Sequence, residues 1–242
     1  MHKYKFLQWI LFFMLITNVK RMNAQTPPDT LSLPQQGLVT IAALTATDDL
    51  ENLKIQLNSA LDTGLAINEI KEALVQLYAY CGFPRSLNAI NAFKIVLDER
   101  IAQGIADSHG KEIVVENNAA DKYEQGRKVL ETLTKMSQSK PAPGFGEFSP
   151  RIDAFLKEHL FADIFVSDVL SYQQRELVTI SALASMSGTE GQLQSHIGIG
   201  MNTGITESQL LQMFDFIEKH ISKNQADGAR TVFSKITSKN KE

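Results

Sequence analysis

The sequence predicts an all-α protein made of two tandem helical repeats that pack against each other as a pseudo-dimer. Apolar residues recur at spacings of three and four along most of the chain, which is typical of amphipathic helices, and no useful stretch alternates as a strand would. Two segments are near-copies: LVTIAAL at 38–44 recurs as LVTISAL at 177–183, and LDTGL at 61–65 recurs as MNTGI at 201–205. One helical pair of this size cannot bury both of its faces alone, so the two copies are expected to cover each other.

Residues 1–24 have the parts of a secretory signal peptide. A short basic start is followed by the largely apolar 14-residue segment FLQWILFFMLITNV, and small Ala24 suits the cleavage position. An uncleaved anchor helix is the alternative, but the segment is short for a bilayer span, and Lys20 and Arg21 close it. We therefore expect an exported protein, periplasmic or secreted, that is cleaved near Ala24 and keeps no stable membrane span.

The charge of the mature chain excludes some partners. Removal of residues 1–24 takes away four of the 24 basic residues and none of the 27 acidic ones, which leaves a formal charge of −7. An acidic chain without a cluster of Lys and Arg is not expected to bind nucleic acid. Cys81 is the single cysteine, so no disulfide can form within the chain although export would permit one.

The first repeat is assigned to residues 25–103. Its leader, QTPPDTLSLPQQ, is expected to be extended because each Pro disfavours helix in the residue before it. Helical spacing then continues in four runs, and Gly64 should end the second of them. CGFP at 81–84 should separate a third helix, about 68–80, from a fourth that ends near Arg100.

A connecting segment, residues 104–150, separates the repeats. Residues 104–122 are polar and predict a surface excursion, and a helix is expected over 123–136. The linker SQSKPAPGFGEFSP (137–150) holds three Pro and two Gly, which disfavour regular structure. The second repeat, residues 151–242, then opens with a new helical run.

Glu176 and His196 are the first candidates for chemistry. Both lie in the second copy, on two helices that should run antiparallel around a turn near Gly188. If they meet, the carboxylate would hold the imidazole in one tautomer and raise its basicity, as a general base requires. The alternative is that Arg175 and Glu176 form an exposed pair at the helix start and that His196 only packs.

The first copy carries a different constellation. Gly37 and Gln56 occupy the positions that match the Glu-His pair, so the two polar groups are present together or absent together. The segment YAYCGFPRSLNA turns tightly and presents Tyr80, Cys81 and Arg85 at a helix N-terminus, where backbone N–H groups and a guanidinium suit a carboxylate ligand. The alternative is a structural elbow with Arg85 solvated. The second copy has EKHISKNQADGA there, so the elbow is expected in the first copy alone.

The other candidate groups are weaker. A lone Cys at an apolar helix end, such as Cys81, is most often a small buried hydrophobe rather than a nucleophile. His109, His159 and His220 have no metal-ligand spacing with each other or with paired carboxylates. The chain lacks a Gly-rich phosphate loop and a G-x-S-x-G motif. We therefore expect no metal and no cofactor.

Two stretches resemble the carboxymuconolactone decarboxylase family, which has the all-helical alkylhydroperoxidase D-like fold. They are RELVTISALASM with QLQSHIGIGMNTGIT in the second copy, and LNSALDTGLAINEIKEALVQLYAYCGFPRSLNAINAF in the first. The resemblance covers about residues 35–100 and 150–222. Family members usually carry one such unit and assemble as trimers or hexamers. The resemblance therefore implies either a homo-oligomer in which three tandem chains form a pseudo-hexamer, which we expect, or a compact pseudo-dimer formed by one chain.

The resemblance implies one of two chemistries. The thiol peroxidase branch uses a Cys-x-x-Cys pair on the helix that carries the His, but SGTEGQLQSH at 187–196 has no thiol, and Cys81 has no resolving partner. The decarboxylase branch needs no metal or organic cofactor. It implies proton transfer at carbon by His196, oriented by Glu176. The carboxylate of a small lactone-like substrate would pair with one of two arginines, Arg175 or Arg85.

Three functions remain open on the sequence. The first is an exported lyase or isomerase without a cofactor, in which Glu176 and His196 act on a small carboxylated molecule. Its binding site would include four neighbours, namely Arg175, Arg85, Tyr80 and Cys81. The second function is a thiol-dependent peroxidase of the alkylhydroperoxidase or peroxiredoxin type that uses Cys81. The third is a binding or assembly protein that kept the fold and lost the chemistry.

Overall fold

The computed structural model describes residues 29–114 and 117–239, and within them every regular element is a helix. The all-α fold class is thereby confirmed. The signal peptide expected at 1–24 lies outside the described residues. Among the helices of the described part, none combines the length and the apolar character that crossing a bilayer requires.

The first copy folds as three helices, and the third is bent in its middle. α2 spans Leu33–Thr47, α3 spans Leu50–Asp62 and α4 spans Ile67–Ala102. Gly82 interrupts α4 with a φ of 82° and a ψ of 159°. An L side chain rarely adopts this conformation, so α4 is two helical segments joined at a glycine. The break falls where CGFP predicts it.

The second copy has the same order of elements. They are α8 (Tyr172–Ala184), α9 (Glu190–Asn202), α10 (Glu207–His220) and α11 (Lys223–Lys239). α2 and α8 begin alike, because Ser32 and Ser171 each cap the helix and pair reciprocally with a Gln at the third helical position. α3 and α9 end alike, at Gly64 with a φ of 96° and Gly204 with a φ of 99°. The tandem repeat and the pseudo-dimer stay predictions that these shared details favour.

The elbow in α4 has a counterpart in the second copy, so the expectation of an elbow in the first copy alone is wrong. α10 ends at His220 and α11 begins at Lys223, with Ile221 between them at a φ of −117° and a ψ of −77°. This break needs neither Gly nor Pro because the chain leaves the helix through negative φ, which any L residue can adopt.

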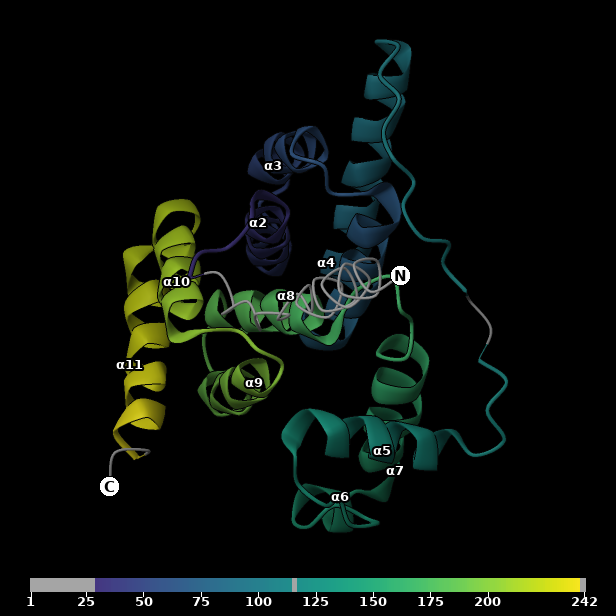
Figure 1. Cartoon of the computed structure of the whole chain (residues 1–242), viewed down its shortest axis with the longest axis vertical. Coiled ribbons are helices and arrows are strands. Elements are labelled where there is room, and N and C mark those ends of the chain that lie inside the picture. Colours follow the sequence, from purple (N-terminus) through teal and green to yellow (C-terminus); the bar gives the residue numbers. More distant parts are fainter. Residues whose placement is uncertain (1–28, 115–116, 240–242) are drawn as a thin grey trace, which may run out of the picture.

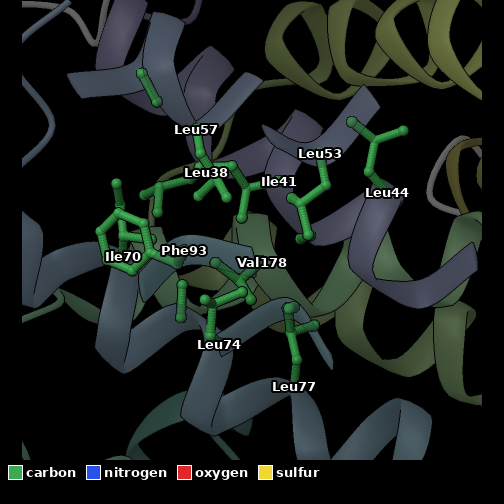
Figure 2. Packing of buried hydrophobic residues seen from close by; sticks show 14 of the residues in the cluster. Leu38, Ile41, Leu44, Leu53, Leu57, Ile70, Leu74, Leu77, Phe93 and Val178 are labelled. Atoms are coloured by element: carbon green, nitrogen blue, oxygen red, sulfur yellow. The ribbon is translucent and has the colours of Figure 1, made fainter. Parts of the chain in front are cut away.

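α2 and α8 lie at the centre of the molecule and pack against each other (Figure 1). The first core cluster joins α2, α3 and α4 to Val178 and Ala182 of α8, and Figure 2 shows part of it. The second joins α8, α9, α10 and α11 to Val39 and Ala43 of α2. Because α2 contributes to both clusters, all residues from Leu38 to Ala46 are buried, which explains why the repeated motif is apolar on every face.

The connecting segment forms a group of helices that extends past its predicted end at residue 150, because residues 151–164, assigned to the second repeat, pack with α5 (Figure 1). They are α5 (Lys122–Thr134), α6 (Phe145–Phe148), α7 (Pro150–Ala154) and the π-helix η1 (Phe155–Ile164). α5 and η1 approach so closely that a Cβ on Gly126 would lie 1.8 Å from the carbonyl oxygen of Lys157. The ammonium of Lys157 is buried and donates to Asp153 at 2.6 Å and to the hydroxyl of Tyr123 at 3.0 Å. Ile199 of α9 joins the same apolar cluster, so this group supports the helix that carries His196.

Candidate functional site

The side chains of Glu176 and His196 are in hydrogen-bond contact. Glu176 lies in the second turn of α8 and His196 in the middle of α9, and Gly188, at a φ of 80°, lies in the turn between the helices. Nδ1 of His196 is 2.8 Å from Oε2 of Glu176. The carboxylate side chain is fully buried and the imidazole is 13% exposed. The ring therefore links a buried carboxylate to the protein surface.

This contact determines what the imidazole can do. A carboxylate accepts hydrogen bonds, so Nδ1 of His196 donates to it, and Nε2 carries the lone pair of the neutral ring. An imidazole in this state can take a proton from a bound molecule. The carboxylate of Glu176 then stabilises the imidazolium that results.

Gly200, one turn after His196 on α9, leaves room for the buried carboxylate. A Cβ on Gly200 would lie 2.8 Å from Cδ1 of Ile180 and 3.8 Å from Cβ of Glu176. A larger residue would require the ends of the Ile180 and Ile205 side chains to move, because packed interiors have little free space. The close approach of the two helices therefore sets the geometry of the pair.

Tyr80 of α4 adds a side chain from the first copy to the site. Its ring meets the imidazole of His196 edge-on, with the ring centroids 5.4 Å apart and the planes at 81°. Its hydroxyl and Oε1 of Glu176 are buried, and neither has a hydrogen-bond partner among the described residues. Burial, and then the charge of Glu176, raise the pKa of Tyr80, so the phenol is protonated at neutral pH. The site therefore holds one buried hydroxyl and one buried carboxylate oxygen without a hydrogen-bond partner among the described residues.

Arg175 is fully buried and held by structural contacts. Its Nη2 donates to Oε2 of Glu72 and to the carbonyl oxygen of Ser167, both at 2.9 Å, and its Nη1 donates to Oε1 of Gln76 at 3.0 Å. Its guanidinium carbon lies 5.6 Å from the ring centroid of Phe165. Burial lowers the pKa of Arg175, and the contact with Glu72 opposes that change.

These contacts correct two expectations for Arg175. Arg175 and Glu176 are both fully buried, so the alternative of an exposed pair at the helix start is wrong. Arg175 was also expected to contact a substrate carboxylate. In the structure its guanidinium is paired with Glu72 instead, and no part of the side chain reaches the surface.

Glu72 and Gln76 of α4, which the sequence did not single out, fix the start of α8. The side-chain nitrogen of Gln76 donates to the carbonyl oxygen of Arg175 and to the hydroxyl of Thr179, both at 2.9 Å. The signal in the sequence is two polar residues four positions apart on a helix whose other inward residues are apolar, among them Leu77. Such a pair indicates a buried polar partner on a neighbouring helix, here Arg175.

Arg85 and Cys81 have other neighbours than the imidazole. Arg85 is half-buried, and its Nη1 lies 3.6 Å from Sδ of Met186 at the end of α8. The thiol of Cys81 donates to the carbonyl oxygen of Leu77 at 3.2 Å, and the side chain packs against the first core cluster. Tyr80 instead packs against the clusters that contain residues of α9. The elbow therefore directs these three residues to different surroundings, and of the three it is Tyr80 whose ring meets the imidazole.

The thiol of Cys81 is poorly suited to nucleophilic chemistry. Burial raises the pKa of Cys81 to about 11, and the positive charge of Arg85 opposes this only in part. At neutral pH the group is therefore a thiol rather than the reactive thiolate. The chain has no second cysteine that could resolve a disulfide.

No group of three or more His, Cys, Asp or Glu side chains in the described part of the chain is placed to hold a metal ion. His159 pairs with Asp163, 3.1 Å from Nδ1 to Oδ2, and His220 stacks on Phe216.

Comparison with known proteins bears on the family of the chain. Residues 15–94 match the family model described as the Carboxymuconolactone decarboxylase family. The match extends through α2, α3 and the bend of α4, and it confirms the family that the sequence resembles. It falls on the first copy, so Glu176 and His196 lie outside the matched residues. No curated protein matches the chain.

Proposed function

Because residues 15–94 carry a carboxymuconolactone decarboxylase domain, we propose that the protein is a cofactor-free lyase or isomerase. Its substrate is a small carboxylated, lactone-like molecule, and Glu176 with His196 transfers the proton. The observation that carries the proposal is the 2.8 Å contact between Nδ1 and Oε2, with the carboxylate fully buried and the imidazole partly exposed. Buried acid-base pairs that reach the surface are often functional sites.

The proton steps follow from the state of the imidazole. In an isomerisation, Nε2 of His196 takes a proton from a carbon next to a carbonyl group, the electron pair passes into that group as an enolate, and the imidazolium returns the proton to a different carbon. In a decarboxylation, Nε2 of His196 first takes up a proton from solvent. The bond from carbon to carboxylate then breaks, carbon dioxide leaves, and the imidazolium gives its proton to the carbon that keeps the electron pair, which returns the ring to its neutral state. A positioned base of this kind contributes a rate factor of about 10² to 10⁴.

The neighbours of the pair have separate roles in this proposal. Glu176 orients the ring of His196 and stabilises its charged form, and Tyr80 fixes the ring from the other copy through the edge-on contact. Pairing of the substrate carboxylate with Arg85 stays a prediction from the sequence, because the printed contact of Arg85 is with Met186, at the other end of α8 from Glu176.

Two other functions compete with this one. A thiol peroxidase would have to use Cys81, and its raised pKa and lack of a second thiol disfavour that chemistry. A binding or assembly protein without catalysis would keep the fold and the polar pair but convert no substrate.

A substrate screen with matched variants tests the proposal. Carboxylated lactones and their open-chain acids are incubated with the protein, and isomerisation and decarboxylation are followed by proton NMR. We expect turnover of at least one compound, its loss in His196→Ala, and normal turnover in His109→Ala, which removes an exposed imidazole elsewhere. Full activity of His196→Ala on a compound that the wild type converts would contradict the proposal.

The proposal includes export and assembly, each with its own test. Residues 1–24 predict removal of a signal peptide, so the mass of the protein recovered from outside the cytoplasm should correspond to a chain beginning at Gln25. Light scattering of this mature protein should give the mass of three chains, as a pseudo-hexamer requires. A cytoplasmic full-length chain or a stable monomer would overturn the respective part.

A further inference from the structure

A hollow lies between α2 and α3 of the first copy and α10 of the second. Its volume is about 260 Å³. The lining residues that matter for its chemistry are Gly37, Gln56, Ser59, Phe216, Lys219 and His220. The volume is just below the roughly 300 to 1,000 Å³ of typical ligand pockets, so only a small ligand would fit.

The cavity occupies the place in the first copy that the Glu-His pair occupies in the second. The repeat offset of 139 relates Gly37 to Glu176, and the offset of 140 relates Gln56 to His196. The same offset of 140 relates Tyr80, which meets the imidazole in one site, to His220, which lines the cavity in the other. Each site is therefore built from two helices of one copy and one helix of the other.

Loss of the pair leaves the cavity without its acid and its base. Gly37 has no side chain where Glu176 stands in the other copy. A Cβ on Gly37 would lie 3.0 Å from Cβ of Ala60, so α2 and α3 pack tightly behind the cavity. Ala60 corresponds to Gly200, which leaves room for the carboxylate in the second copy. A carboxylate at position 37 would therefore need a second change at Ala60, and the lining has no carboxylate that could pair with an imidazole.

The lining carries positive charge without a matching carboxylate. Lys219 and His220 are its titratable residues, and no Asp or Glu is among the residues that line it. The nearby acids Asp215 and Glu218 form their printed ion pairs with Arg230 and not with Lys219. Burial, and then the charge of Lys219, lower the pKa of His220. At neutral pH the imidazole is therefore uncharged and Lys219 is the cation of the site.

The remaining lining favours a flat ligand with hydrogen-bond acceptors. The rings of Phe216 and His220 stack with their planes at 18° and their centroids 6.3 Å apart, which gives one wall an aromatic edge. The amide of Gln56 and the hydroxyl of Ser59 line the cavity and form no hydrogen bond with other described residues. Both groups can donate to a carboxylate.

We propose that this cavity binds a small carboxylated molecule with a flat apolar body and holds it without chemical change. Lys219 pairs with the carboxylate, Gln56 and Ser59 donate to its oxygens, and the stacked rings of Phe216 and His220 pack against the body of the ligand. The inference does not rest on the proposed function, because none of the residues that line the cavity belongs to the Glu-His pair.

The test measures binding of 4-fluorobenzoate by fluorine NMR to the full chain carrying His196→Gln, in which the proposed catalytic pair is broken. The neutral 4-fluorobenzamide, which has almost the same shape, is the comparison ligand. We expect 4-fluorobenzoate to bind saturably and 4-fluorobenzamide to bind about fivefold more weakly. The difference is no larger because a partly exposed ion pair changes affinity by about fivefold at most.

Two charge variants in the same background locate the site. Lys219→Gln should lower the affinity for 4-fluorobenzoate by about threefold to fivefold and leave the affinity for 4-fluorobenzamide unchanged. The control is Lys128→Gln, which removes the same charge from an exposed residue of α5 outside the cavity lining. It should change neither of the two affinities. Absence of saturable binding, equal affinity for acid and amide, or unchanged affinity in Lys219→Gln would overturn the inference. Binding that is present in the wild type and lost with His196→Gln would place the ligand at the Glu-His pair, which would overturn this inference and support the proposed function.

Discussion

The ring of Tyr80, from the first copy, meets the ring of His196, from the second, edge-on at 5.4 Å. The candidate site is therefore shared between the two copies. α4 supplies Tyr80 and also holds α8 in place through Glu72 and Gln76. A single copy could not form this site. The family match covers residues 15–94, which include Tyr80, and the Glu-His pair lies in the second copy, so both parts of the chain contribute to one site.

Replacement of Tyr80 separates the role of its ring from that of its hydroxyl. Tyr80→Phe keeps the ring and removes a buried hydroxyl that has no protein partner in the described part, so we expect the free energy of unfolding to stay equal or to rise by up to about 1 kcal/mol. Tyr80→Ala should lower it by about 3 kcal/mol, because a packed ring is lost. Urea unfolding followed by circular dichroism measures both. A loss of stability in Tyr80→Phe as large as in Tyr80→Ala would show that the hydroxyl has a partner.

The buried pair of Arg175 and Glu72 is predicted to serve stability. Glu72→Leu leaves the guanidinium buried without its partner and should lower the free energy of unfolding by about 3 to 5 kcal/mol. The double variant Glu72→Leu with Arg175→Met should recover much of this loss, because neither charge then remains buried. Thermal and urea unfolding of the single and double variants measure the effect. A neutral effect of Glu72→Leu would show that the pair of Glu72 and Arg175 does not contribute to stability.

The reactivity of Cys81 should follow its raised pKa. In the folded protein its alkylation by iodoacetamide should increase with pH up to about 11, whereas the chain unfolded in urea should show a midpoint near about 8.5. The folded state therefore holds the proton more tightly, so the contribution of Cys81 to stability is complete below the unfolded pKa and is lost as pH rises toward the folded one. Mass spectrometry of the alkylated chain measures the rate at each pH. A midpoint near neutrality in the folded protein would instead favour the thiol peroxidase.

Gly126 should tolerate no side chain. Gly126→Ala places a Cβ against the carbonyl oxygen of Lys157 and should lower the free energy of unfolding by about 3 kcal/mol, because α5 and η1 must separate. Gly228→Ala is the matched control in α11, where a Cβ meets no atom within 4 Å, and it should raise stability by about 0.5 to 1 kcal/mol. Differential scanning calorimetry compares the two. Equal effects of the two substitutions would mean that α5 and η1 do not approach as closely as described.

The parts of the fold that could be predicted are those with a local cause. Helix starts and stops follow from side chains and glycines near them, as at Ser171 and Gly64, and Gly188 marks the turn that brings α8 and α9 together. The repeat then indicates which positions correspond. These signals led from the sequence to Glu176 and His196 as a pair.

The parts that escaped prediction depend on packing between distant segments. The guanidinium of Arg175 is bound by Glu72 and Gln76, about 100 positions earlier, and periodicity cannot tell which polar residue meets which. The break at Ile221 could not be predicted because no Gly or Pro lies at this position. The π-helix η1 contacts α5 where Gly126 allows close approach, and that requirement is visible only once both helices are placed.

Solvent deuterium exchange tests the central claim most directly, because it reports proton transfer at carbon even when no product leaves. A carboxylated lactone is incubated with the protein in heavy water, and the loss of its carbon-bound proton signals is followed by NMR. The account predicts exchange with the wild type, a fall of at least about 100-fold in His196→Gln, a smaller fall in Glu176→Gln, and no change in His109→Ala. Exchange that persists undiminished in His196→Gln would contradict the assignment of this imidazole as the base.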